Sequence, residues 1–460
     1  MKWALLLIAA ASMVPLSAWL RRNPREAPKL WILVGFLAVE HGPLHVYMAM
    51  DSVAGFWPGY TLGAEISLLD LIAVAIYFVL PRSKHSLPFL FSMGFYFFAV
   101  FLSVFQGSVP KSALYYCWQL GRVFFFYAVV AKACAADERV VPALLKGIAF
   151  GMFLAAGQAI WERFGAGVLQ TAGGFPHRNF LGMVSHFIVY PFFALLLAGE
   201  RGWLPITVSL AGAIVAILTT SRATVAFAGF GYLVVFLLSA MRGWTPRKSM
   251  TMVTAAIAVI ALSPLFLSSF EQRFGPGSDV ESSFFAPDEA RVQMEEASRM
   301  MLADHPMGVG ANHFVTAANT LGYYARSGLS WANYGSYVHN AYWLVAVETG
   351  YLGLFAFVIM LMRPLAVAFM CGWRNRRDKR GDLLLGLGVG LLTVYVHNLY
   401  EWIFVTFQTE YLFAINAAMI AGLAQQLGYW RRVETTRIKP DSVAKPIARP
   451  ARTFGLNSRR

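Results

Sequence analysis

The side chains best suited to chemistry gather in one polar stretch, from about Phe270 to Val338, and in the dipeptide His339-Asn340 that closes it. The stretch carries eight acidic residues and four arginines but no lysine. Arginine neutralises anionic groups without losing its proton, and imidazole accepts a proton near neutral pH. This combination suits a site that binds an anion and accepts a proton.

His339 is the best candidate for a general base. It directly precedes an apolar stretch over 340–362, so we expect it at a helix N-terminus, where the helix dipole disfavours the imidazolium form. A simple helix cap is the alternative role. The pattern around His339 is repeated at Val396-His397-Asn398. Glu401 follows His397 by four residues, so both are expected either to line the same outer cavity or to brace two helices.

Two arginines are candidates for binding a phosphate. Arg222 lies in a turn between two apolar stretches, with no acidic residue within ten positions, and a guanidinium binds phosphate through paired hydrogen bonds. An arginine that reaches the membrane surface is the alternative. Arg291 lies in a helix predicted to begin near Pro287 and to end before Pro306. Glu295 follows at a four-residue spacing, so a solvated salt-bridge row remains open for Arg291.

Two further arginines could contact substrate. Arg178 follows a glycine-rich turn and precedes the apolar stretch 179–198, where a helix N-terminus would attract an anion; Asn179 is expected to cap that helix. Arg122 and Asp70 both fall at membrane depth, where a charge faces the protein interior or a wet cavity. A structural ion pair and a phosphate contact both remain open for Arg122.

The composition defines the elements that must position these residues. Hydrophobic residues make up 58% of the chain and charged residues 13%, against about 25% charged in soluble proteins. Segments of about 20 apolar residues can cross a membrane, and thirteen are found: 3–20, 30–50, 62–80, 88–106, 113–133, 143–162, 179–198, 202–220, 222–240, 250–268, 340–362, 383–401 and 404–427. We predict an all-α, polytopic membrane protein with about 12–13 transmembrane helices and one large, partly helical periplasmic loop.

The net charge of +14 is concentrated in the segments 363–382 and 431–460. Basic residues mark cytoplasmic segments, so the polar loop is expected on the periplasmic face. No nucleic-acid partner is expected, because no aromatic-basic motif or nucleic-acid fold accompanies the charge. The predicted division is ten transmembrane helices over 1–268, the periplasmic loop over 269–339, three more helices over 340–428, and a basic cytoplasmic tail over 429–460.

The order of the motifs over about 170–365 resembles that of the O-antigen ligase and polymerase superfamily of bacterial envelopes. A Gly/Phe/His/Asn turn is followed by Ser221-Arg222, an Arg-bearing helix, His-Pro-x-Gly-x-Gly-x-x-x-Phe ending at Phe314, His339-Asn340, and Glu-x-Gly-x-x-Gly ending at Gly353. The resemblance implies a metal-independent, inverting glycosyltransferase of the bacterial inner membrane, without a cofactor. Its donor would be a glycan on undecaprenyl diphosphate, and its acceptor a lipid A core sugar or another glycan.

By this resemblance, Arg222 and Arg291 bind the diphosphate and His339 activates the acceptor. The predicted substrate-binding residues are Arg178, Arg122, Asn340 and His397. A polymerase that joins repeat units is the first alternative. A polysaccharide or lipid transporter is a weaker one, because the sequence lacks paired Gly/Pro-broken helices in two matching halves. A structural scaffold for envelope assembly is weaker still.

Overall fold

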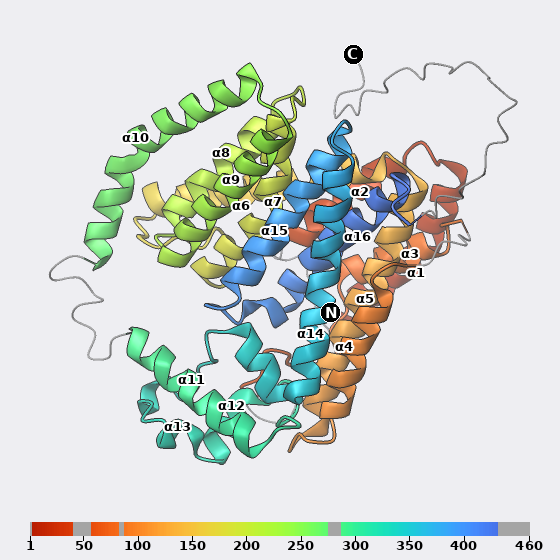
Figure 1. Ribbon diagram of the computed structural model, residues 1–460. Helices are drawn as coiled ribbons and strands as arrows, with labels where there is room; N and C mark the ends of the chain where they lie inside the picture. Colours follow the sequence, from red (N-terminus) through yellow and green to blue (C-terminus); the bar gives the residue numbers. More distant parts are fainter. Residues whose placement is uncertain (1, 40–56, 82–86, 275–286, 431–460) are drawn as a thin grey trace, which may run out of the picture.

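The computed structural model describes residues 2–39, 57–81, 87–274 and 287–430, and across these ranges the chain is helical without a strand (Figure 1). The all-α prediction is therefore confirmed. The first ten helices are α1 (Lys2–Arg22), α2 (Ala27–Val39), α3 (Leu68–Tyr77), α4 (Leu90–Ser103), α5 (Pro110–Ala136), α6 (Val140–Phe164), α7 (Arg178–Leu197), α8 (Leu204–Leu218), α9 (Arg222–Arg242) and α10 (Pro246–Phe274).

The polar loop that follows α10 is partly helical, as predicted. It contains α11 (Pro287–Asp304), α12 (Phe314–Thr320), α13 (Tyr323–Arg326) and the short 3-10 helix η1 (Trp331–Asn333). The C-terminal part of the bundle consists of α14 (Ala341–Arg374), α15 (Lys379–His397), η2 (Ile403–Val405) and α16 (Phe407–Gln426). The loop helices α11, α12 and α13 lie together at one end of the bundle (Figure 1).

Each of the thirteen predicted spans coincides with one helix, in chain order. Within the part of the chain that the structure describes, five helices are long and apolar enough to cross a membrane: α5, α6, α7, α9 and α14. Four shorter apolar helices, α2, α3, α4 and α8, accompany them. This supports a multi-pass membrane protein, while the count of 12–13 crossings stays a prediction. The predicted span 30–50 coincides with α2 up to Val39, and its remainder lies outside the described residues.

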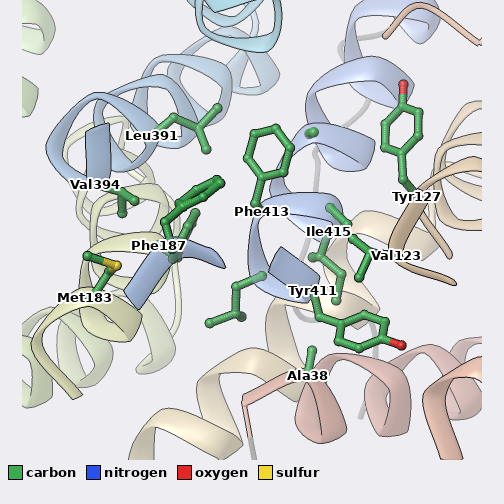
Figure 2. Packing of buried hydrophobic residues seen from close by; sticks show 14 of the residues in the cluster. Ala38, Val123, Tyr127, Met183, Phe187, Leu391, Val394, Tyr411, Phe413 and Ile415 are labelled. Atoms are coloured by element: carbon green, nitrogen blue, oxygen red, sulfur yellow. The ribbon is translucent and has the colours of Figure 1, made fainter. Parts of the chain in front are cut away.

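The core of the bundle is built around α16, which is buried from Thr409 to Ala424. A helix that is apolar on all sides must be covered on all sides, and α16 packs against α5. Figure 2 shows side chains of both helices, Val123 and Ile415 among them, in the same buried cluster. A neighbouring interface joins α7 and α15, where Phe187 and Leu391 are buried together.

Glycine allows these helices to approach closely. A Cβ atom at Gly422 of α16 would come within 2.3 Å of the Cβ of Cys134 on α5. A Cβ at Gly386 of α15 would come within 2.7 Å of the carbonyl oxygen of Tyr190 on α7. In a membrane, helices associate mainly through such close packing, because lipid is as apolar as the side chains. A larger residue at either glycine would therefore force the helix pair apart.

The polar loop is attached to the bundle where α14 is interrupted. Gly350 has φ 70° and ψ −174°, which is outside the helical region. Two carbonyl groups just before the break accept hydrogen bonds from the loop instead of from the next helical turn. The Val309 N–H donates to the Val347 oxygen at 2.9 Å, and the Gly310 N–H donates to the Glu348 oxygen at 2.9 Å. The loop thus satisfies backbone groups that would otherwise be left unpaired within the bundle.

The loop glycines of the His-Pro motif are required by this attachment. Gly308 and Gly310 have φ of 93° and 100°, a region that residues with a Cβ rarely adopt. A Cβ at Gly308 would lie 2.5 Å from the Glu348 oxygen, and one at Gly310 would lie 2.5 Å from the Gly107 Cα. The conformation and the close contacts together explain why two glycines occur at this spacing.

The side chain of Glu348 fixes the next part of the loop. It is 2% exposed and accepts a hydrogen bond from the Phe314 N–H at 3.0 Å and from the Tyr60 hydroxyl at 2.6 Å. Asn312 extends the attachment, because its side chain exchanges hydrogen bonds with the backbone of Thr61 at 3.0 and 2.7 Å. The polar loop is thereby held at a fixed position against the end of the bundle.

The predicted orientation can be tested by cysteine labelling. We expect an impermeant thiol reagent to label Ala332→Cys, at an exposed position in η1, in intact cells, and to label Arg201→Cys, between α7 and α8, only after lysis. The three native cysteines are buried, so background labelling should be low. Labelling of Arg201→Cys but not of Ala332→Cys in intact cells would reverse the orientation.

Candidate active site

The candidate active site is organised around the carboxylate of Glu401, which lies between α15 and α16. The Glu401 side chain is 3% exposed, and its two oxygens contact groups from three other parts of the chain. His339 Nδ1 lies 3.3 Å from Oε2, the Arg291 guanidinium lies 3.5 Å from Oε1, and the Asn179 amide donates to Oε1. A buried carboxylate is stable only when it is paired and hydrogen-bonded, so these contacts hold the site together.

Four separate elements deliver these residues to one point. Arg291 comes from the second turn of α11, Asn179 from the first turn of α7, and His339 from the segment that enters α14. The Ala341 N–H donates to the carbonyl oxygens of Asn398 and Glu401, at 2.8 and 3.1 Å. This backbone bridge fixes the start of α14, and therefore His339, against the segment that carries Glu401.

The sequence left two roles open for Arg291 and two for His339, and the geometry distinguishes between them. Arg291 pairs with Glu401, and not with Glu295 in a solvated row. Asn340 is the cap of α14, since its Oδ1 accepts hydrogen bonds from the N–H groups of Tyr342 and Trp343 at 3.0 and 3.2 Å. The His339 side chain therefore takes no part in capping and remains 30% exposed.

Arg178 and Arg222 lie at the same end of the bundle as this group. Arg178 is half-buried, donates to Gln170 and is within electrostatic reach of Glu401 and Arg291. Arg222 is exposed and begins α9. The first two turns of α7 touch the start of α9, because a Cβ at Gly182 would lie 2.2 Å from the Thr224 hydroxyl. Both arginines therefore begin helices that pack together at the end of the bundle that carries Glu401.

The structure separates Arg122 and His397 from this face. The Arg122 guanidinium lies 2.8 Å from Asp70 and 3.6 Å from Glu65, and all three side chains are buried. This is the ion-pair geometry, and a substrate phosphate would have to displace Asp70 to reach Arg122. His397 is fully buried, with its ring centroid 5.3 Å from that of His186 and 5.1 Å from that of Phe227. A direct substrate contact by His397 would require an opening between α7, α9 and α15.

The charge of the site is positive. Burial alone would raise the pKa of the Glu401 carboxyl, but the hydrogen bond from His339, the positive charges of His339 and His397 in their protonated forms, and the charge of Arg291 outweigh burial and keep this pKa below its ordinary value. Glu401 is therefore ionised at neutral pH. Among the described residues, the guanidinium groups of Arg291 and Arg178 lie within electrostatic reach of this one carboxylate, so this part of the site carries more positive than negative charge and is suited to an anion.

Two residues of this site, Asn179 and Glu401, are not among the predicted catalytic and substrate-binding residues, although Glu401 was expected to line the outer cavity or to brace two helices. Asn179 was expected to cap α7, but the cap is His177, whose Nδ1 accepts the Asn179 N–H at 3.3 Å. The Asn179 side chain is thus available to Glu401. For Glu401, the four-residue spacing from His397 suggested a shared helix face. However, α15 ends at His397, and the chain then turns so that Glu401 faces the site.

These observations define an all-helical, multi-pass membrane protein with a cationic site at one end of its bundle. A family model described as O-antigen ligase matches residues 206–358, which contain Arg222, Arg291 and His339. The predicted resemblance to this superfamily is therefore confirmed, and the match supports a role in the assembly of glycans. The chain has no match among curated proteins.

Proposed function

We propose that this protein transfers a glycan from undecaprenyl diphosphate to an acceptor hydroxyl at the periplasmic face of the inner membrane. The observation that carries the proposal is the contact of one buried carboxylate, Glu401, with both Arg291 and His339. A base for the acceptor and a cation for the leaving diphosphate are thereby held side by side, as such a transfer requires.

His339 would act as the base. A neutral imidazole that donates its Nδ1–H to Glu401 leaves Nε2 free to accept a proton. The acceptor oxygen would then form a bond to the anomeric carbon while the bond from that carbon to the diphosphate oxygen breaks. The hydroxyl proton passes to Nε2, and a single in-line displacement of this kind inverts the anomeric configuration.

The arginines would stabilise the leaving group. Negative charge increases on the diphosphate as its bond to the sugar breaks, and guanidinium groups that are already in position lower the barrier to that step. Arg291 is oriented by Glu401, and Arg222 and Arg178 lie at the same end of the bundle. Because the leaving group is stabilised in this way, the proposed reaction requires no metal ion.

Arginine-to-lysine substitutions test the diphosphate contact. Arg222→Lys and Arg291→Lys keep the charge but lose the planar pair of donors, and we expect each to lower transfer by about tenfold or more. The assay is transfer from purified lipid-linked donor by protein in detergent. Arg299→Lys, in the same helix as Arg291 but paired with Glu296, is the control and should retain activity. Full activity of both test variants would show that Arg222 and Arg291 do not bind the diphosphate.

A polymerase that joins repeat units would use the same chemistry and remains the alternative. The two activities differ in the acceptor, so deletion of the gene distinguishes them. Loss of attachment of full-length glycan to its carrier supports a ligase, whereas retention of attachment with single repeat units supports a polymerase.

A further inference from the structure

A second cationic site lies at the opposite end of α14 from His339, in the turn that joins α14 to α15. A hollow of about 410 Å³ is present there, lined by Arg374, Asn375, Arg376, Arg377 and Asp378. Since α14 has 34 residues and a helix rises about 1.5 Å per residue, this hollow is far from the candidate active site. It therefore needs an explanation that does not depend on the transfer reaction.

The acidic residues around this turn are already paired with other bases. The pairs are Asp378 with Arg380 at 2.7 Å, Asp382 with Arg242 at 3.2 Å, Glu200 with Lys379 at 2.8 Å and Glu138 with Arg380 at 3.6 Å. The exposed Arg374, Arg376 and Arg377 are not among these pairs. The hollow consequently has an excess of positive charge, and an anion would bind there without displacing an internal acid.

Aromatic rings hold two of the three arginines in place. The Arg376 guanidinium lies 4.6 Å from the ring centroid of Trp373, and that of Arg374 lies 5.6 Å from the ring centroid of Tyr429. The carbonyl of Cys371, near the end of α14, accepts hydrogen bonds from the backbone and side chain of Asn375 at 3.2 and 2.8 Å. This carbonyl is therefore satisfied within the turn. The ring contacts restrict the guanidinium groups of Arg374 and Arg376 before any ligand binds.

We propose that this hollow binds the phosphate headgroup of an anionic membrane phospholipid. Guanidinium groups bind phosphate through paired hydrogen bonds, and basic clusters beside transmembrane helices attract anionic lipids. Arg374 ends a helix that is long and apolar enough to cross the membrane. One turn before it, Met370 is 49% exposed and offers an apolar surface for an acyl chain. The basic tail 431–460 is a poor occupant because its charge has the same sign.

Lipid titration of the purified full-length protein tests this site. Native mass spectrometry in detergent would compare the binding of dioleoyl phosphatidylglycerol with that of dioleoyl phosphatidylcholine. We expect the wild type to prefer phosphatidylglycerol by about tenfold or more. The variant Arg374→Gln/Arg376→Gln/Arg377→Gln should lose this preference, whereas inorganic phosphate at millimolar concentration should not displace the bound lipid.

The control removes the same charge from three exposed arginines elsewhere. Arg22→Gln/Arg25→Gln/Arg201→Gln should bind phosphatidylglycerol within about twofold of the wild type, because a specific site depends on position as well as on net charge. If the test variant does not fold, Arg377→Gln alone should weaken binding by about fivefold. Equal loss in both triple variants, equal binding of the two lipids, or displacement by inorganic phosphate would each overturn the proposal.

Discussion

Replacing His339 by alanine is expected to reduce glycan transfer by about 10²–10⁴-fold, the usual cost of losing an acid–base group. The imidazole is 30% exposed and lies 3.3 Å from Glu401, so its loss removes the proton acceptor and leaves the arginines in place. Binding of the lipid-linked donor should therefore be retained. Transfer and donor binding would be measured separately on the purified protein in detergent.

Two further variants separate the role of the base from that of the fold. His339→Gln should also fail, because an amide forms hydrogen bonds but does not accept the acceptor's proton at neutral pH. His397→Ala is the comparison within the repeated Val-His-Asn pattern, and it should have a milder effect on transfer because His397 lies in the core, away from the exposed face. A strong loss for His397→Ala together with an active His339→Ala would show that the base has been assigned to the wrong histidine.

The helices were predictable from the sequence because their signal is local. Runs of about 20 apolar residues identify membrane helices independently of their partners, and the thirteen runs coincide with thirteen helices. Helix ends near proline were also predictable, as Pro287 and Pro306 bracket α11. The bounds of the spans were less accurate where a helix is shorter than its apolar run, as for α3 within 62–80.

The centre of the site was not predictable, because its contacts are not local. Glu401 meets Asn179, Arg291 and His339, which are 222, 110 and 62 positions away in the chain. In the sequence, the pattern around Glu401 is its four-residue spacing from His397. This spacing places both side chains on one face only if the helix continues from His397 to Glu401. Since α15 ends at His397, this assumption fails, and the two side chains point to different environments. A single sequence shows the types of the candidate residues but not which carboxylate joins them.

Glu401→Gln is the strongest test of this arrangement, because it keeps the size of the side chain and removes its charge. A carboxylate accepts the Nδ1–H of His339, whereas a glutamine amide can donate to Nδ1 and hold the proton on Nε2, where it blocks the base. We therefore expect transfer to fall by about 10²–10⁴-fold. A role limited to structure would lower activity only in proportion to the folded protein, so kcat and KM must be measured on correctly folded protein.

The stability of the Glu401→Gln variant should depend on pH in a defined way. Because the pKa of Glu401 is lowered in the folded state, its ionised form stabilises the wild type fully above the unfolded value of about 4.3. This contribution is lost as the pH falls through the lowered pKa. The difference in Tm between wild type and variant should thus be largest near neutral pH and shrink below about pH 4.

Glu295→Gln, at an acid on the same helix as Arg291, is the control and should show neither effect. A variant that is equally active and equally stable at neutral pH would mean that Glu401 does not position His339.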